Sequence, residues 1–265
     1  MKSPAAPHIR ALTHRLFGDK AFAAWNCGRY HDAQHAMYVA EVVGLLARGR
    51  RMQPDQQMFL AQVALLHDAD PRPAGTPASV PRTLEWMWLH QESLQLTLGW
   101  TDLAFSTALA LIARTDFPFD DLPRRNDTMF DGLSPLQLYR NLLLRLEPGE
   151  QRRRAFEDAQ LLRFADQCAN YCRDFATASL SVDDLSRELS SVGPAVSRWD
   201  LDTASFLDAI GADSDEDQKL NLTEGLEARM FSRNELFRLL PRTQREAVAR
   251  NQALFRLEKK VHATG

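Results

Sequence analysis

The stretch YHDAQHAMYV, residues 30–39, places two histidines four residues apart at the start of an apolar run. At helical spacing, positions i and i+4 lie on one face, one turn apart. His31 and His35 are therefore expected to stack above an apolar stripe. A second signal follows downstream, where an apolar run ends in the adjacent pair His67-Asp68. Together the two features predict a site built from imidazole and carboxylate groups.

The rest of the chain has the pattern of successive helices. Runs with helical periodicity are separated by proline- and glycine-containing breaks, and the short alternating runs of Val, Ile and Thr that mark strands are largely absent. Ser134-Pro135 has the form of a helix cap followed by proline at the first helical position. The sequence therefore predicts an all-α fold. Helices are expected over residues 8–17, 31–47, 54–66, 83–97, 102–114, 134–146, 151–175, 185–189, 200–210, 221–238 and 241–257.

A domain boundary is expected near residues 179–184, where the pattern becomes more polar. Residues 1–178 would then form the domain that carries the histidine pattern. Residues 179–265 would form an additional helical C-terminal region, which has few histidines and no evident ligand cluster. We expect this extension to serve in packing or to bind a protein partner.

The composition is that of an ordinary globular protein. The chain has 265 residues, of which 45% are hydrophobic and 25% charged, and a net charge of −3 gives no electrostatic case for binding nucleic acid or an anionic membrane. No apolar run approaches the ~18 residues of a membrane helix, and the first residues lack the apolar core of a signal peptide. Three cysteines are too few for a disulfide framework. We therefore expect a soluble, cytoplasmic protein.

Four residues have the chemistry of metal ligands. His35, His67 and Asp68 supply two imidazoles and one carboxylate, and Asp166 is an acid in an otherwise largely apolar helical stretch. A buried acid needs a partner because an unpaired buried charge is costly, and a metal ion is such a partner. Mixed imidazole and carboxylate ligands suit one or two divalent ions, and they do not distinguish Fe, Mn, Zn and Mg.

The order of these residues resembles the H…HD…D signature of the HD-domain metal-dependent phosphohydrolases, over roughly residues 25–175. The opening Tyr30-His31-x-x-x-His35 is similar to that of the cyclic-nucleotide phosphodiesterase branch and its bacterial HD relatives. The segments 67–70, 92–93, 112–116 and 164–166 resemble further motifs of the same proteins. Pro71-Arg72-Pro73 stands where the phosphodiesterases often have another histidine. The resemblance implies an HD-type helical bundle.

The resemblance also implies a mechanism, in which a metal-bound hydroxide attacks phosphorus and Asp68 bridges the metal ions. His31 would be the general acid that protonates the leaving group. Glu92 would orient the hydroxide or hold a second metal ion through water. For His31 the alternative is a helix-start residue that bonds to Asp32 or the backbone, and for Glu92 it is a solvated surface position.

Further residues near these motifs are candidates for supporting the ligands or contacting substrate. Asp70, Thr115 and Asp116 would fix the ligands, although each is also a plausible turn residue. Arg72 and Arg114 would contact phosphate, to which a guanidinium offers two parallel hydrogen bonds.

The leading hypothesis is a metal-dependent phosphohydrolase whose substrate is a small phosphomonoester or phosphodiester of nucleotide-like chemistry. The alternative is a non-catalytic regulatory protein that keeps the HD scaffold and binds a partner through residues 179–265. A nuclease is less favoured, because the net negative charge opposes tight binding of a polyanion. The sequence leaves the oligomeric state open.

Overall fold

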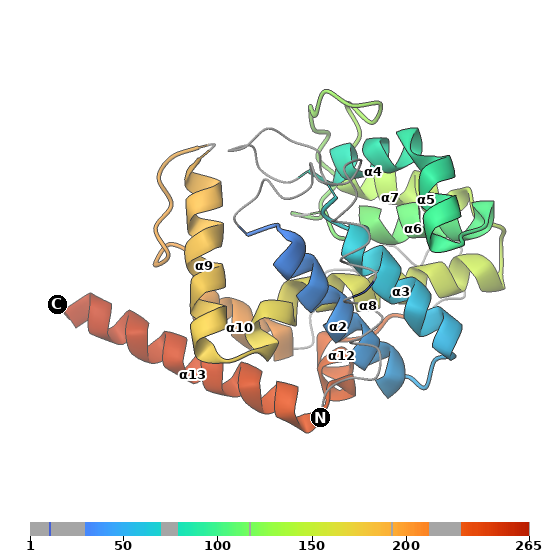
Figure 1. Cartoon of the computed structure of the whole chain (residues 1–265). Coiled ribbons are helices and arrows are strands. Elements are labelled where there is room, and N and C mark those ends of the chain that lie inside the picture. The colour runs from blue at the N-terminus through green and yellow to red at the C-terminus, as the bar shows by residue number, and fades with distance from the viewer. Residues whose placement is uncertain are drawn as a thin grey trace.

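A computed structural model of the chain describes residues 11, 30–69, 79–116, 118–191, 193–211 and 229–264. Within these ranges the regular structure is helical and contains no strand, which confirms the predicted all-α fold (Figure 1). In chain order the helices are α2 (Ala33–Gly49), α3 (Pro54–Leu66), α4 (Val80–Leu89), α5 (Gln91–Leu98), α6 (Asp102–Ala113), α7 (Pro135–Leu144), α8 (Glu150–Cys168), the 3-10 turn η2 (Ala169–Cys172), α9 (Phe175–Ser190), α10 (Thr203–Gly211), α12 (Arg233–Leu239) and α13 (Arg242–Thr264).

Local capping explains where several helices begin. The Asp32 side chain accepts a hydrogen bond from the His35 backbone N–H at 2.8 Å, so α2 begins two residues later than the periodicity predicted. The predicted cap of α7 is confirmed: Ser134 accepts from the Gln137 N–H at 3.0 Å, and Pro135 occupies the first helical position. The Asp32 cap therefore places His35 in the first turn of α2.

The single helix predicted over residues 83–97 is two helices, α4 and α5. The break is at His90, whose φ of −112° and ψ of 21° lie outside the helical region. Its ring stacks on Trp86, with Nδ1 2.8 Å from the Trp86 carbonyl oxygen, and these contacts hold the break without glycine or proline. The end of α5 is conventional, because Gly99 adopts a φ of +70° in the left-handed region that glycine favours.

The helix predicted over residues 151–175 is also interrupted. It ends at Cys168, continues as η2 and is followed by α9, which Asp174 caps by accepting from the Thr177 N–H at 2.9 Å. The expected boundary at residues 179–184 and the predicted segment 185–189 both lie inside α9. This sequence looks polar, but Ala178 and Val182 are fully buried, so packing of one face maintains the helix.

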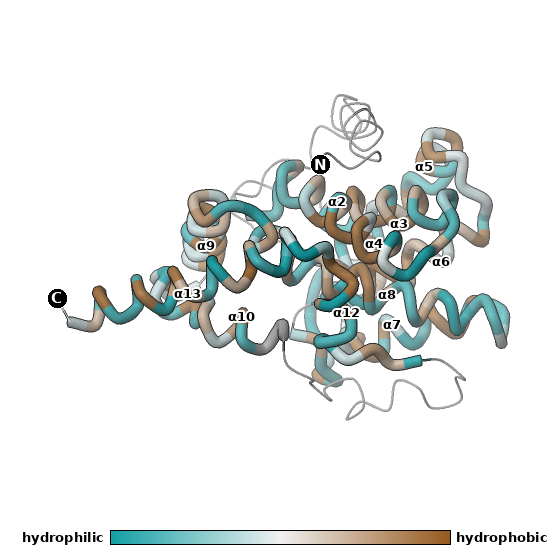
Figure 2. The backbone as a smooth tube through the Cα atoms, turned by 90° about the horizontal axis from the view of Figure 1, so that it is seen from below, coloured by the Kyte–Doolittle hydropathy of each residue, from teal (hydrophilic) through white to brown (hydrophobic). Residues whose placement is uncertain are grey.

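The core of the molecule lies where α2, α3, α6 and α8 meet. Helix α2 packs along α3 and against α8, and α6 contacts α7 and α8. In Figure 2, where the tube is coloured by residue hydropathy, hydrophobic residues concentrate around α2, α3 and α8. Fully buried side chains on these helices include Val39, Leu46, Leu60, Leu66 and Leu162. This packing holds the start of α2, the end of α3 and the end of α8 in fixed positions relative to one another.

The C-terminal helices pack on this core. Helix α13 contacts η2, α9 and α10, and its far end extends beyond the rest of the molecule (Figures 1 and 2). Asn251 of α13 is fully buried and donates hydrogen bonds to the backbone oxygens of Tyr171, at 2.9 Å, and Arg173, at 3.0 Å. The last third of the chain is therefore bonded directly to the turn that follows α8.

In the described part of the chain, no helix by itself combines the length and the apolar composition that a membrane crossing requires. Helices α5 and α6 meet the criterion only as a pair bent by 106°.

Candidate metal centre

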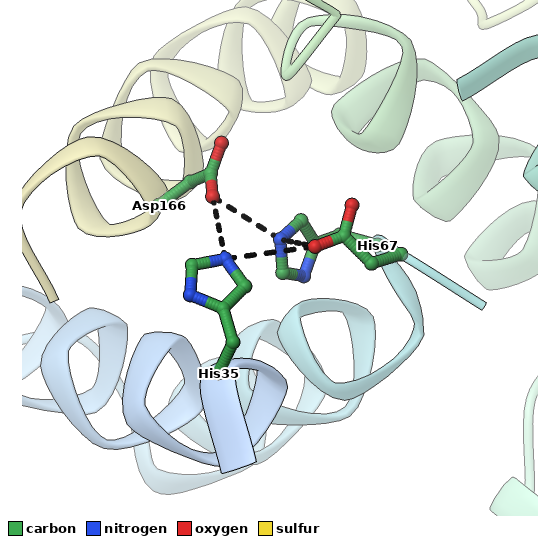
Figure 3. A group of neighbouring side chains, drawn as sticks. His35, His67 and Asp166 are labelled. Carbon is green, nitrogen blue, oxygen red and sulfur yellow. Dashed lines mark hydrogen bonds and ion pairs between the residues drawn. The ribbon is translucent and has the colours of Figure 1, made fainter. Parts of the chain in front are cut away.

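The four predicted ligands come together at one end of the core. His35 lies in the first turn of α2, His67 and Asp68 directly follow α3, and Asp166 lies near the end of α8. Each offers one nitrogen or oxygen atom, and these four atoms all lie within 4.8 Å of one another. In Figure 3 the imidazole rings of His35 and His67 and the Asp166 carboxylate point toward one another. The group could hold a metal ion.

The spacing of the donor atoms matches the size of a coordination shell. His67 Nε2 lies 2.9 Å from Asp68 Oδ2 and 3.2 Å from Asp166 Oδ1, while His35 Nε2 lies 3.5 Å and 3.1 Å from the same two oxygens. An ion about 2.0–2.2 Å from each donor places neighbouring donors about 3.0–3.5 Å apart. These four separations match a coordination shell, and the chemistry of the donors suits a divalent ion.

The hydrogen bonding of His67 leaves one nitrogen directed toward the carboxylates. His67 Nδ1 donates to the Ala64 backbone oxygen at 2.7 Å, so in the neutral ring Nε2 carries a lone pair. That lone pair faces Asp68 and Asp166, and Asp68 Oδ2 is buried without a hydrogen-bond partner among the described residues. Lone pairs that face one another require a proton or a cation between them.

The pKa values of these residues describe the site when it holds a proton in place of a metal ion. Burial lowers the pKa of His67, but the carboxylates of Asp68 and Asp166 raise it by more, so it lies well above its ordinary value. Burial raises the pKa of Asp166, but hydrogen bonds from His35 and His67 reduce it to about 2. The pKa of Asp68 is lowered as well, because the charge of His67 outweighs burial. A proton on His67 thus occupies the electrostatic position of a cation.

His31 is held beside the ligands by a glutamate from the C-terminal region. Its Nδ1 lies 2.8 Å from Glu188 Oε1, and Glu188 Oε2 accepts the backbone N–H groups of Tyr30 and His31 at 3.0 and 3.3 Å. The His31 ring centroid is 5.8 Å from that of His35. Nε2 of His31 therefore has no hydrogen-bond partner among the described residues and is free to serve a ligand.

Glu188 has no recognisable signal in the sequence. Its side chain is only 5% exposed, yet it sits in a polar stretch of α9, 157 positions from His31. Asn170 was also missed: it is 3% exposed, and its side-chain nitrogen lies 3.3 Å from His35 Nδ1. Asn170 follows Asp166 by four residues, a spacing that could have indicated a shared helical face.

The other predicted site residues are not among the four grouped ligands. Glu92 is exposed in the first turn of α5 and is not part of the cluster, so its predicted catalytic role has no geometric support; an acid there suits the helix dipole. Thr115 donates to the Ile112 backbone oxygen at 2.8 Å, which is the turn role. Asp116 pairs with Arg124 at 3.3 Å, and the Arg114 guanidinium lies 3.8 Å from the Phe119 ring centroid. Asp70 and Arg72 lie outside the described residues.

A large groove of about 1100 Å³ lies away from these ligands, between the first turns of α3, α6 and α8. Phe59 and Trp100 line it, as does Asp158 from the middle of α8. Burial raises the pKa of Asp158 to about 7. None of the four ligand residues lines this groove, so the volume of the groove does not identify it as the metal centre.

Comparisons with protein-family models, curated proteins and solved structures found no match to this chain.

Proposed function

We propose that the protein is a metal-dependent phosphohydrolase that hydrolyses a small phosphomonoester or phosphodiester of nucleotide-like chemistry. The observation that carries the proposal is the set of four donor atoms within 4.8 Å of one another, with His31 just before the N-cap of α2. The same residues, in the same order, carry the resemblance to the HD-domain phosphohydrolases. Here the resemblance and the local chemistry support the same reaction class.

One or two divalent ions, of Fe, Mn, Zn or Mg, would be held by His35, His67, Asp68 and Asp166. Such an ion, when bound, would lower the pKa of a water molecule and stabilise negative charge on the phosphoryl oxygens. The chain itself orients the imidazoles, because the Ala64 carbonyl fixes the tautomer of His67 and Asn170 contacts His35. Asp68 and Asp166 balance the charge of the ion.

His31 is the proposed proton donor to the leaving oxygen. Burial lowers its pKa, but the carboxylates of Asp68 and Glu188 raise it by more, so the ring holds a proton more firmly than an isolated histidine does. A general acid has to be protonated at the working pH, and this environment favours that form. Glu188 fixes the ring through Nδ1, so the proton for transfer is on Nε2.

The proposal is tested by metal content and by hydrolysis of substrates with different leaving groups. The full-length protein is loaded with Mn²⁺, Fe²⁺, Zn²⁺ or Mg²⁺ and assayed on bis(p-nitrophenyl) phosphate and on a panel of nucleotides. His67→Ala and Asp68→Ala should lose both the bound metal and hydrolysis. His31→Ala should keep the metal and lose about 10²–10⁴-fold in turnover of nucleotides, whose alkoxide leaving group needs a proton.

The leaving group provides the sharper comparison. p-Nitrophenolate departs without protonation, so His31→Ala should lose much less activity on the p-nitrophenyl ester than on nucleotides. His262→Ala is the matched control, since His262 is exposed and stacks on Trp199 at the end of α13. Equal losses on both substrates would exclude His31 as the acid. Tight metal binding without hydrolysis of any phosphoester would favour the non-catalytic regulatory alternative.

A further inference from the structure

The inference concerns Asn170, which packs its side-chain amide against the metal-distal nitrogen of His35. Asn170 lies in η2 and is 3% exposed, and its amide nitrogen is 3.3 Å from His35 Nδ1. The same side chain also hydrogen-bonds Tyr30. A carboxamide has a donor end and an acceptor end of nearly the same shape.

Without an ion, the proton of neutral His35 belongs on Nε2. That nitrogen lies 3.1 Å from Asp166 Oδ1, and a carboxylate oxygen only accepts hydrogen bonds. Nδ1 then carries a lone pair, and the amide nitrogen of Asn170 is correctly placed to donate to it. All three groups are satisfied in this arrangement.

An ion at Nε2 reverses the requirement. Nε2 must then offer its lone pair, so the proton of the neutral ring moves to Nδ1. The amide nitrogen of Asn170 would then face an N–H donor, and two donors would oppose each other in a buried place. Such an unsatisfied buried pair is costly. The amide oxygen of the same side chain removes the conflict if it takes the place of the nitrogen.

We propose that Asn170 is a positioning residue that turns its carboxamide over when the site binds metal, donating to His35 Nδ1 in the metal-free protein and accepting from it in the loaded protein. Tyr30 tolerates both states, because a phenolic hydroxyl can donate or accept. The inference rests on the metal site proposed above, and it adds the coupling between metal binding and the tautomer of His35.

The backbone of η2 keeps Asn170 in place while its side chain turns. Asn251 of α13 donates to the backbone oxygens of Tyr171 and Arg173. Tyr171 is the residue after Asn170, and Arg173 is three residues after it. Asn251 is fully buried, so these bonds are shielded from water. The turn is thus fixed from the C-terminal region, and the last torsion of Asn170 is the part left to rotate.

Substitutions that fix one polarity test the proposal on the full-length protein. Asn170→Asp keeps only acceptors, so it favours the Nδ1–H tautomer that metal binding needs. Asn170→Leu keeps the approximate size and removes both hydrogen-bonding ends. Affinity for Mn²⁺ and for Zn²⁺ is measured by calorimetry, with Asn141→Asp, on the exposed surface of α7, as the control for one added negative charge. The melting curve of each variant by circular dichroism shows that it is folded.

We expect Asn170→Leu to weaken metal affinity about 10–100-fold, the usual effect of losing a partner of a ligating histidine, and Asn170→Asp to tighten it about 10-fold. Asn141→Asp should leave it unchanged. Imidazole ¹⁵N shifts should show the proton of His35 on Nε2 in the metal-free wild type and on Nδ1 in the Zn²⁺-loaded wild type. If the wild type binds metal and neither Asn170 variant changes its affinity, the inference alone is overturned. If the wild type binds none of the ions, the proposed function fails and the inference fails with it.

Discussion

Replacing Glu188 by glutamine separates the charge of this side chain from its shape. In the wild type, Oε2 accepts two backbone N–H groups, at 3.0 and 3.3 Å, and Oε1 faces His31 Nδ1 at 2.8 Å. The oxygen of a glutamine can keep both backbone bonds, which leaves its amide nitrogen opposite Nδ1. Neutral His31 can accept from that nitrogen, whereas the protonated ring has a hydrogen on both nitrogens and cannot. The cost of Glu188→Gln should therefore depend on pH.

The direction of this pH dependence follows from the raised pKa of His31. Burial lowers this pKa, but Asp68 and Glu188 raise it by more. A raised folded pKa contributes stability that is fully present below the unfolded value, about 6.5, and lost as the pH rises through the folded value. We expect Glu188→Gln to reduce the free energy of unfolding by about 1.5–3 kcal/mol at about pH 6, the range for a hydrogen bond to a charged group. At about pH 9 the loss should be under about 1 kcal/mol.

Urea denaturation of the full-length protein in chelator, followed by circular dichroism, measures both values. Glu188→Ala also leaves both backbone N–H groups without their acceptor, so it should cost about 2–4 kcal/mol at about pH 9 and more at about pH 6. Glu258→Gln is the matched control, because Glu258 is also in the C-terminal region and pairs with Arg198, away from His31; it should cost at most about 1 kcal/mol. An equal cost of Glu188→Gln at both pH values would refute the reasoning.

Three further predictions concern the C-terminal region, Asp158 and the metal site. A chain ending at residue 178 should lack a cooperative melt by circular dichroism, because it loses Glu188, Asn251 and the buried side chains of Val182, Leu207 and Phe255; a truncated protein that melts like the full chain would contradict this. Asp158→Asn should be more stable than the wild type above pH 7: burial raises the Asp158 pKa from 3.8 to about 7, so its favourable contribution is present below 3.8 and lost as the pH rises through about 7. In urea denaturation at about pH 8, we expect Asp158→Asn to be more stable than the wild type by about 1–2 kcal/mol. If this difference between variant and wild type were the same at pH 5 as at pH 8, the prediction would be wrong. Mn²⁺ at 100 times its Kd should stabilise the wild type and His262→Ala by about 2.7 kcal/mol in the same denaturation experiment and leave His67→Ala unchanged; stabilisation of His67→Ala would show that the ion binds elsewhere.

The ligand set could be predicted because its members have local signals. His35 lies four residues after His31 at the start of an apolar run, His67-Asp68 closes an apolar helix, and Asp166 is an acid among apolar neighbours. Glu188 has no such signal: its position depends on contacts with Tyr30 and His31, just before α2, which no local pattern encodes. The break at His90 was missed for a similar reason, since a side-chain contact with Trp86 holds it where propensity favours a continuous helix.

The bonds that complete the site also determine when it can form during synthesis of the chain. His31 and Glu188 are 157 positions apart, and Asn251 bonds to Tyr171 across 80 positions. Contacts of such long sequence separation form late, because a large loop must close before they contribute. His31 and His35 therefore leave the ribosome long before the residues that hold them. We expect metal capture in its final geometry to follow the completion of translation, and the C-terminal helix to be the last part of the site to assemble.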